Sequence, residues 1–262
     1  MHADIARLDF ANRRRSLLGY CLGMAVYALV VVAIYPAFKT STSLDKLIQN
    51  DSTAAALLGV TGRISSSGGW LNANIYANFL PLIMLLLTIG YGAACLAGQD
   101  EDGTLSLLAV LPVRRRAIVV QKAAAMTAQA AVLAVTVAVL VIIGRSFQLE
   151  ISAAHVASIS AAVLLMGLDF GMVTMAAGAL TGRRGAALGT GTAVAAASYL
   201  ISSLAPVVSW IQPGRYASLF YWSVGNSQIS RGVSLGDYTV LIVTGLCALA
   251  AAMLAFRRLD LH

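Results

Sequence analysis

A cluster of charged residues between two long apolar segments is the first candidate for a functional element. Three acids at residues 100–102 precede a short leucine-rich pattern, and three arginines at residues 114–116 follow it. Acids at the beginning of a short helix and bases at its end suit the helix dipole. Leu105 and Leu108 fall at helical spacing and give this helix an apolar face. The pattern predicts an amphipathic cytoplasmic helix on which another protein pushes.

A second candidate is Asp169, the only acid well inside a long apolar segment. An ionisable residue at that depth is typical of a proton relay or an ion ligand. A relay normally needs a partner base or a second acid, and the surrounding sequence supplies neither. Hydroxyl or backbone groups of a neighbouring helix would also satisfy the carboxyl group. An ion-coupled secondary carrier therefore stays open beside a structural hydrogen bond.

A third candidate is a serine with the spacing of a nucleophile elbow, Gly232-Val233-Ser234-Leu235-Gly236. Asp237 and His155 are the available partners for a catalytic triad. The elbow requires a strand, a turn and a helix within a soluble sheet, and here a loop leads into an apolar segment. An integral-membrane serine hydrolase is therefore the less favoured alternative.

The sequence contains no nucleotide-binding P-loop. Its only lysines are Lys39, Lys46 and Lys122, and none of them follows a glycine, as the lysine of G-x-x-x-x-G-K-[ST] must. If ATP drives this protein, another chain binds the ATP and its magnesium. We expect no catalytic residue, cofactor or metal site in this chain.

The composition indicates which elements position these residues. The chain has 262 residues, of which 59% are hydrophobic and 11% are charged, against roughly 25% charged residues in soluble domains. The net charge of +7 does not indicate a nucleic-acid partner, because the bases stand in short clusters at the ends of apolar runs. These features predict a single all-α membrane domain over residues 1–262.

Six apolar runs are each long enough to cross a hydrocarbon core, which takes about 17 residues or more. A basic, partly apolar surface helix is expected over residues 2–15, and a proline-induced kink or opening at Pro81. Glycine pairs spaced by four residues predict close packing between the fourth and fifth spans. The predicted spans cover about residues 17–38, 75–98, 117–143, 153–180, 186–210 and 238–256, with the charged helix at about 101–112.

The distribution of bases predicts the orientation. With both termini inside, twelve of the 18 Lys and Arg residues fall on the cytoplasmic side and six on the outer side. Positive residues concentrate in short cytoplasmic loops. We therefore expect cytoplasmic amino and carboxyl termini, and the charged helix then faces the cytoplasm.

In order along the chain, these motifs resemble ABC-2 type exporter permeases, the membrane-spanning subunits of bacterial ATP-binding-cassette transporters. One stretch looks like the family's signature: an acid followed by Gly-Thr-Leu at residues 101–105, then Leu-Pro-Val at 111–113, three arginines and Lys122. The turn Thr181-Gly182-Arg183-Arg184-Gly185 and the ending Phe256-Arg257-Arg258 are also similar to the family's. The resemblance covers nearly the whole chain.

The resemblance implies a type V exporter fold, like that of the G subfamily, with a surface helix, a cytoplasmic coupling helix and a re-entrant segment before the last span. It also implies two permease subunits, identical or paralogous, in a bacterial plasma membrane, and a separate ATPase subunit that carries ATP and Mg. Membrane lipid is a further expected partner, and nucleic acid is not. The residues that would couple to the ATPase are Glu101, Gly103, Thr104, Leu105, Leu108 and Pro112.

In such exporters the substrate path runs between the two permeases along spans one, two and five. The absence of a large extracellular domain favours a lipid-like, peptide or drug-like substrate. The positions in this chain that correspond to such a path are Tyr27, Asn78, Phe79, Met84, Tyr199 and Ser202.

Overall fold

The computed structural model describes residues 4–39, 65–104, 114–225 and 228–257, and within these ranges it contains helices and no strand. The elements labelled η are 3₁₀ or π segments. In chain order the elements are α1 (Asp4–Phe38), α4 (Ser67–Leu71), η1 (Asn72–Phe79), α5 (Leu80–Ala93), η2 (Ala94–Gly98), α6 (Gln99–Glu101), α8 (Arg115–Ile143), η3 (Gly144–Phe147), α9 (Ala153–Thr181), α10 (Arg184–Leu204), η4 (Gln212–Ala217), α11 (Leu219–Ser223), α12 (Gln228–Arg231) and α13 (Leu235–Phe256).

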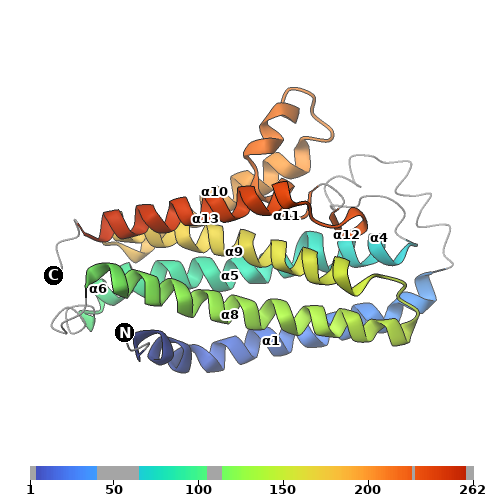
Figure 1. Ribbon diagram of the computed structural model, residues 1–262, viewed down its shortest axis with the longest axis horizontal. Helices are drawn as coiled ribbons and strands as arrows, with labels where there is room; N and C mark the ends of the chain where they lie inside the picture. The colour runs from blue at the N-terminus through green and yellow to red at the C-terminus, as the bar shows by residue number, and fades with distance from the viewer. Residues whose placement is uncertain (1–3, 40–64, 105–113, 226–227, 258–262) are drawn as a thin grey trace.

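Six helical stretches in the described part of the chain are long and apolar enough to cross a membrane, which confirms the predicted number. In Figure 1 the long helices lie side by side along the long axis of the molecule. The six stretches are Arg7–Phe38, Ser67–Glu101, Arg115–Phe147, Ala153–Thr181, Arg184–Leu204 and Leu235–Phe256.

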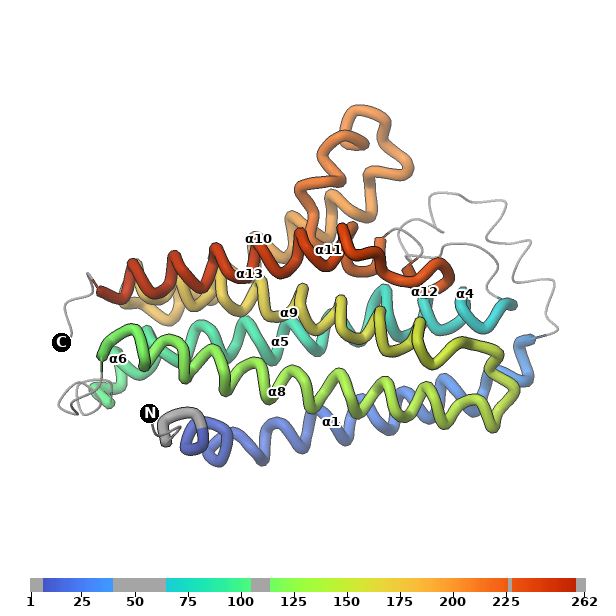
Figure 2. Tube along the Cα trace, in the orientation of Figure 1, coloured from blue at the N-terminus to red at the C-terminus, as the bar shows by residue number. Residues whose placement is uncertain are grey.

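Helix α9 lies at the centre of the bundle. Helices α5, α8, α10 and α13 all pack against it, and α1 packs along α8 (Figures 1 and 2). The apolar window of α9 is 61% buried, against 28% for α1 and for α13. On α1, Leu18 and Leu22 are 66% and 69% exposed. Such leucines belong against lipid, because a soluble monomer rarely exposes a large contiguous apolar surface.

Small residues let α9 approach its neighbours closely. The helices that it approaches agree only in part with the predicted packing between spans four and five. Gly178 of α9 contacts Ala187 of α10, as expected for spans four and five. Gly167 instead faces Met84 of α5, and Gly171 lies between Thr88 of α5 and Met126 of α8. Gly185 and Gly189 of α10 have open space around them. The spacing identified close-packing surfaces, but not which helix covers each one.

Two helix boundaries differ from the prediction. Residues 2–15 do not form a separate surface helix, because one continuous helix, α1, runs from Asp4 to Phe38. The fifth span ends at Leu204 rather than at residue 210. Pro206 explains the earlier end, since proline has no backbone N–H to continue the helical hydrogen bonds.

The second span opens locally where proline predicted a distortion. A π-helical segment, η1, precedes α5, and Pro81 stands in the first turn of α5. The wider turn leaves carbonyl groups that side chains satisfy: Asn78 donates to the carbonyl oxygen of Ala73 at 2.8 Å, and Asn74 to that of Trp70 at 2.9 Å. A proline ring disrupts the regular ladder one turn before it, which accounts for the segment.

Three elements lie at one end of the bundle: the beginning of α1, the end of α13 and the short helix α6 (Figure 1). Toward the other end, the chain after α10 projects sideways from the bundle and returns through α11 and α12 to α13 (Figure 1). The predicted re-entrant segment falls on this returning part, and its position in a membrane stays a prediction.

Candidate functional site

The turn after α6 joins two spans that are distant in sequence. Glu101 is the last residue of α6, and its Oε1 accepts a hydrogen bond from the backbone N–H of Arg184 at 2.9 Å. Arg184 is the first residue of α10, and the N-cap residue Arg183 gives this helix no side-chain cap. A carboxylate suits this place, because the first N–H groups of a helix lack partners and carry partial positive charge.

The local backbone explains the residues around Glu101. Gly103 has φ +67°, a left-handed conformation that glycine adopts without steric cost. Thr104 donates from its hydroxyl to the carbonyl oxygen of Gln99 at 3.2 Å, across the turn. Gly103 and Thr104 are both exposed, so this turn is accessible to a partner.

The remaining residues of the predicted coupling helix, Leu105, Leu108 and Pro112, lie outside the described residues. One detail of the prediction is corrected: Glu101 ends the helix of the second span rather than beginning the next one. Its carboxylate caps α10, a contact that the sequence did not reveal.

Near the same end, a buried ion pair links the first three spans. Lys122 of α8 has no exposed side-chain surface, and its ammonium lies 3.0 Å from Oδ2 of Asp9 on α1. Tyr91 of α5 donates its hydroxyl to the same oxygen at 2.7 Å. The guanidinium of Arg13 lies 4.8 Å from the centre of the Tyr91 ring. Sequence analysis missed Asp9 and Tyr91; the only available signal was the acid Asp9 among the arginines of a basic segment.

Three of the predicted substrate-path residues line one apolar cavity. The cavity is about 520 Å³ and lies between α10 and the stretch formed by η1 and α5. Asn78 and Phe79 line it from η1, and Tyr199 lines it from α10. Phe220 of α11 closes one end, with its ring centre 5.4 Å from that of Tyr199. The cavity thus lies between spans two and five.

The other three predicted path residues have different surroundings. Tyr27 of α1 stacks on Phe79 with ring centres 4.3 Å apart and donates to the carbonyl oxygen of Asn74. Met84 is fully buried and packs into the notch left by Gly167, inside the bundle. Ser202 of α10 lies next to Gly225. None of these three side chains lines the apolar cavity.

Asp169 lies at the interface between α9 and α13. It is 2% exposed, and its Oδ1 lies close to Gly245 of α13. Its Oδ2 has no hydrogen-bond partner within the described residues. No base or second acid of the described residues forms an ion pair with this carboxyl group. The structural hydrogen bond and the relay both stay predictions.

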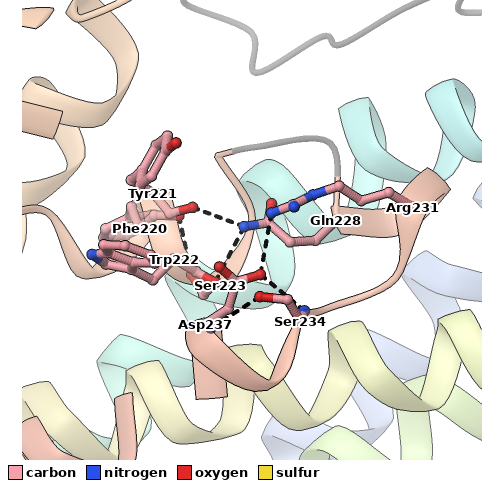
Figure 3. Close-up of polar contacts among 8 residues, drawn as sticks. All are labelled: Phe220, Tyr221, Trp222, Ser223, Gln228, Arg231, Ser234 and Asp237. Atoms are coloured by element: carbon pink, nitrogen blue, oxygen red, sulfur yellow. Dashed lines mark hydrogen bonds and ion pairs between the residues drawn. The ribbon is translucent and has the colours of Figure 1, made fainter. Parts of the chain in front are cut away.

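Ser234 has a structural role at the start of α13. Its Oγ accepts from the backbone N–H of Asp237 at 3.1 Å, and Asp237 accepts from the N–H of Ser234 at 3.0 Å, which makes a capping box. Arg231 pairs with the same carboxylate at 3.1 Å (Figure 3). The strand that a nucleophile elbow needs is absent from the described part of the chain. This geometry accounts for the serine without hydrolysis.

A second set of bonds in the same region holds the returning segment together. The side-chain amide of Gln228 donates to the carbonyl oxygens of Tyr221 and Trp222, at 2.8 and 3.2 Å (Figure 3). Gln228 is fully buried, so these bonds tie α11 to α12 from within. No group of three or more His, Cys, Asp or Glu in the described ranges is placed to hold a metal ion.

The comparison with protein families decides the identity of this bundle. The model of the ABC-2 family transporter proteins matches residues 3–261, nearly the whole chain. The chain belongs to the ABC-2 transporter family. A comparison with curated proteins found no match.

Family membership assigns the chain as the permease component of an ABC transporter, a multi-pass membrane protein that associates with an ATP-binding subunit.

Proposed function

We propose that this ABC-2 permease is the membrane subunit of an exporter that moves a lipid-like, peptide or drug-like substrate out of the cell. A separate ATPase subunit, which carries ATP and Mg, supplies the energy. The observation that carries the proposal is the family match over residues 3–261 in a chain whose sequence has no P-loop. The chain therefore needs a separate ATPase subunit, and permeases of this family associate with such a subunit.

The turn at Glu101 is the proposed point of contact with the ATPase. The exposed side chains of Glu101 and Thr104 are available to a partner, and Gly103 fixes a sharp change of direction between them. The bond from Glu101 to Arg184 ties this turn to the first residue of α10. A displacement of the turn would therefore move the end of the second span and the beginning of the fifth together.

The same two spans form the walls of the 520 Å³ cavity, with Asn78 and Phe79 on one side and Tyr199 on the other. A change in their relative position alters the width of this cavity. This gives a direct route from the cytoplasmic turn to the proposed substrate path. The route needs no titratable residue inside the membrane.

The proposed assembly contains two permeases and two ATPase subunits in a bacterial plasma membrane. Both termini are assigned to the cytoplasm, since twelve of the 18 basic residues then lie on that side. This assignment also puts the turn at Glu101 in the cytoplasm, because it lies at the same end of the bundle as the two termini (Figure 1).

Reconstitution into liposomes tests the proposal. The permease alone, the permease with its ATP-binding subunit, and the same complex with an ATPase subunit unable to hydrolyse ATP are compared for substrate movement. We expect movement only in the complete complex with ATP. Transport by the permease alone under an ion gradient would instead support a secondary carrier.

A further inference from the structure

A small polar pocket lies at the end of the bundle where α1 and α10 begin. It has a volume of about 180 Å³ and receives side chains from α1, α5, α8 and α10. Its polar lining consists of Arg13, Ser16, Tyr20, Tyr91, Gln129 and Arg184. The pocket adjoins the turn at Glu101 through Arg184 and the ion pair of Lys122 through Tyr91, but Glu101, Asp9 and Lys122 do not line it.

The two arginines of this pocket have no acidic partner among the described residues. Arg13 lies over the ring of Tyr91, and Arg184 uses its backbone N–H, not its guanidinium, to bind Glu101. Of the neighbouring acids, Asp9 is bound by Lys122 and Tyr91, and Glu101 accepts from the backbone N–H of Arg184. Two guanidinium groups that share one pocket and form no ion pair with the described residues attract an anion, and their planar forks suit phosphate oxygens.

A buried amide in the same pocket also lacks a partner. Gln129 of α8 is 3% exposed, and its Nε2 makes no hydrogen bond within the described residues. Leaving a buried donor unpaired is costly, and nearly all such groups in folded proteins find an acceptor. An oxygen-rich ligand in the pocket would supply the acceptor. This observation is independent of the arginines and indicates the same kind of ligand.

The polar pocket adjoins the larger apolar cavity, because Leu86 and Gly90 of α5 line both of them. On the apolar side the walls include Pro81, Leu82 and Leu85. The two neighbouring hollows therefore offer a cationic site beside an apolar one. Arg13 stands four residues before Leu17, the first buried leucine of α1.

We propose that these two hollows together bind an anionic phospholipid from the leaflet in which α1 begins. The phosphate lies between Arg13 and Arg184 and accepts a hydrogen bond from Gln129, and an acyl chain follows the surface of α5 past Leu86 and Gly90 into the apolar cavity. Basic pockets between membrane helices are known to hold anionic head groups. The inference concerns binding alone and does not depend on ATP-driven export.

Native mass spectrometry of the delipidated full-length chain in detergent tests the site. Phosphatidylglycerol is titrated against phosphatidylcholine with the same acyl chains, and a short-chain phosphatidylglycerol and inorganic phosphate are added as competitors. We expect the anionic lipid to bind more tightly than the zwitterionic one. The short-chain lipid should compete weakly, and inorganic phosphate should not compete at all.

Single substitutions with matched neighbours locate the binding. Arg13→Gln and Arg184→Gln should each weaken phosphatidylglycerol binding about five- to tenfold, the factor that one lost head-group contact of this kind gives. Arg14→Gln and Arg183→Gln remove the same charge from exposed neighbours outside the pocket and should leave binding within about twofold. Gln129→Leu should weaken binding without any change of charge.

Three results would overturn the site. Equal affinity for the two lipids would exclude a pocket for a charged head group. Equal losses of phosphatidylglycerol affinity in the pocket variants and in their neighbours would show that general surface charge causes the binding. Full competition by inorganic phosphate would leave a small-anion site with no role for the acyl chain. Because Gln129 is buried, the melting temperature of its variant is measured first; if that variant does not fold, the two arginine comparisons decide.

Discussion

The carboxylate of Glu101 and the backbone N–H of Arg184 lie 2.9 Å apart, although 83 residues separate them in the chain. The contact joins the end of the second span to the first residue of the fifth. The same acid belongs to the exposed turn on which we propose that the ATPase acts. One side chain thus connects the proposed point of input with a helix that lines the apolar cavity.

Reversing the charge of Glu101 should uncouple the transporter without unfolding it. In Glu101→Lys an ammonium replaces the carboxylate at the positive end of α10, so the cap is lost and repulsion takes its place. We expect normal membrane insertion, a small change in melting temperature and a several-fold loss of substrate-stimulated ATPase activity in the complex.

Asp102→Lys provides the matched control for Glu101, because it makes the same charge change at an exposed neighbour for which no contact with α10 is seen. It should retain more of the stimulated activity. Equal activity of Glu101→Lys and wild type would exclude the proposed role of this acid.

Substitutions of Lys122 and Asp9 should have strongly coupled effects on thermal stability. Removing one partner of a buried pair typically costs about 3–5 kcal/mol. Asp9→Leu should be the more damaging change, because it leaves a fully buried ammonium, whereas in Lys122→Met the carboxylate keeps Tyr91 and is 12% exposed. The double variant should recover much of the loss. Thermal unfolding in detergent measures all three.

Arg14→Met is the control for the Lys122 variant. It removes an exposed base and should have little effect on the melting temperature. If the two single losses simply add in the double variant, then the two side chains do not interact as the structure indicates.

The contact between α5 and α9 depends on Gly92. A Cβ at this position would meet the backbone carbonyl oxygen of Gly171, which cannot rotate away. Gly92→Ala should therefore destabilise the bundle by about 1–3 kcal/mol, the usual cost of overpacking. Gly90→Ala, two residues away on the same helix, meets nothing within 4 Å and should be neutral or slightly stabilising. Similar melting temperatures for the two variants would contradict this packing.

The sequence was sufficient to predict the six spans, because a membrane-crossing helix needs a continuous apolar run whatever packs around it. It also predicted the distortion at Pro81, whose cause is local. It could not assign Gly167 to α5, or Gly171 to α5 and α8, since helical spacing defines a face but not the helix that covers it. The pairing of Asp9 with Lys122 joins residues 113 apart, and no local pattern marks such a contact.

The substrate-path residues divide for a related reason. Asn78, Phe79 and Tyr199 line the cavity, whereas Met84 occupies the notch at Gly167. Residues five apart on one helix point in different directions, so membership of the second span did not determine which side chains reach the cavity.

Asp169 distinguishes the exporter from an ion-coupled carrier. Its carboxyl group packs against Gly245 with no charged partner among the described residues. Asp169→Asn keeps the shape and removes the ionisable group, so ATP-driven transport in proteoliposomes should continue. Asp169→Leu should lower the melting temperature, because the methyl groups of leucine are larger than the carboxylate oxygens that they replace at the close approach to Gly245 of α13. Loss of transport in the folded Asp169→Asn variant would favour an ion-coupled carrier over an ATP-driven exporter.

The accessibility of Thr104 tests the central claim most directly. Thr104→Cys is placed in a chain without Cys21, Cys95 and Cys247, and Glu150→Cys, exposed at the other end of the bundle, is the control. With a membrane-impermeant maleimide, we predict that Thr104→Cys is labelled only in inverted vesicles and is protected when the ATPase subunit binds, whereas Glu150→Cys is labelled only in right-side-out vesicles. Labelling of Thr104→Cys from the outer side, or no protection by the bound ATPase subunit, would contradict the account.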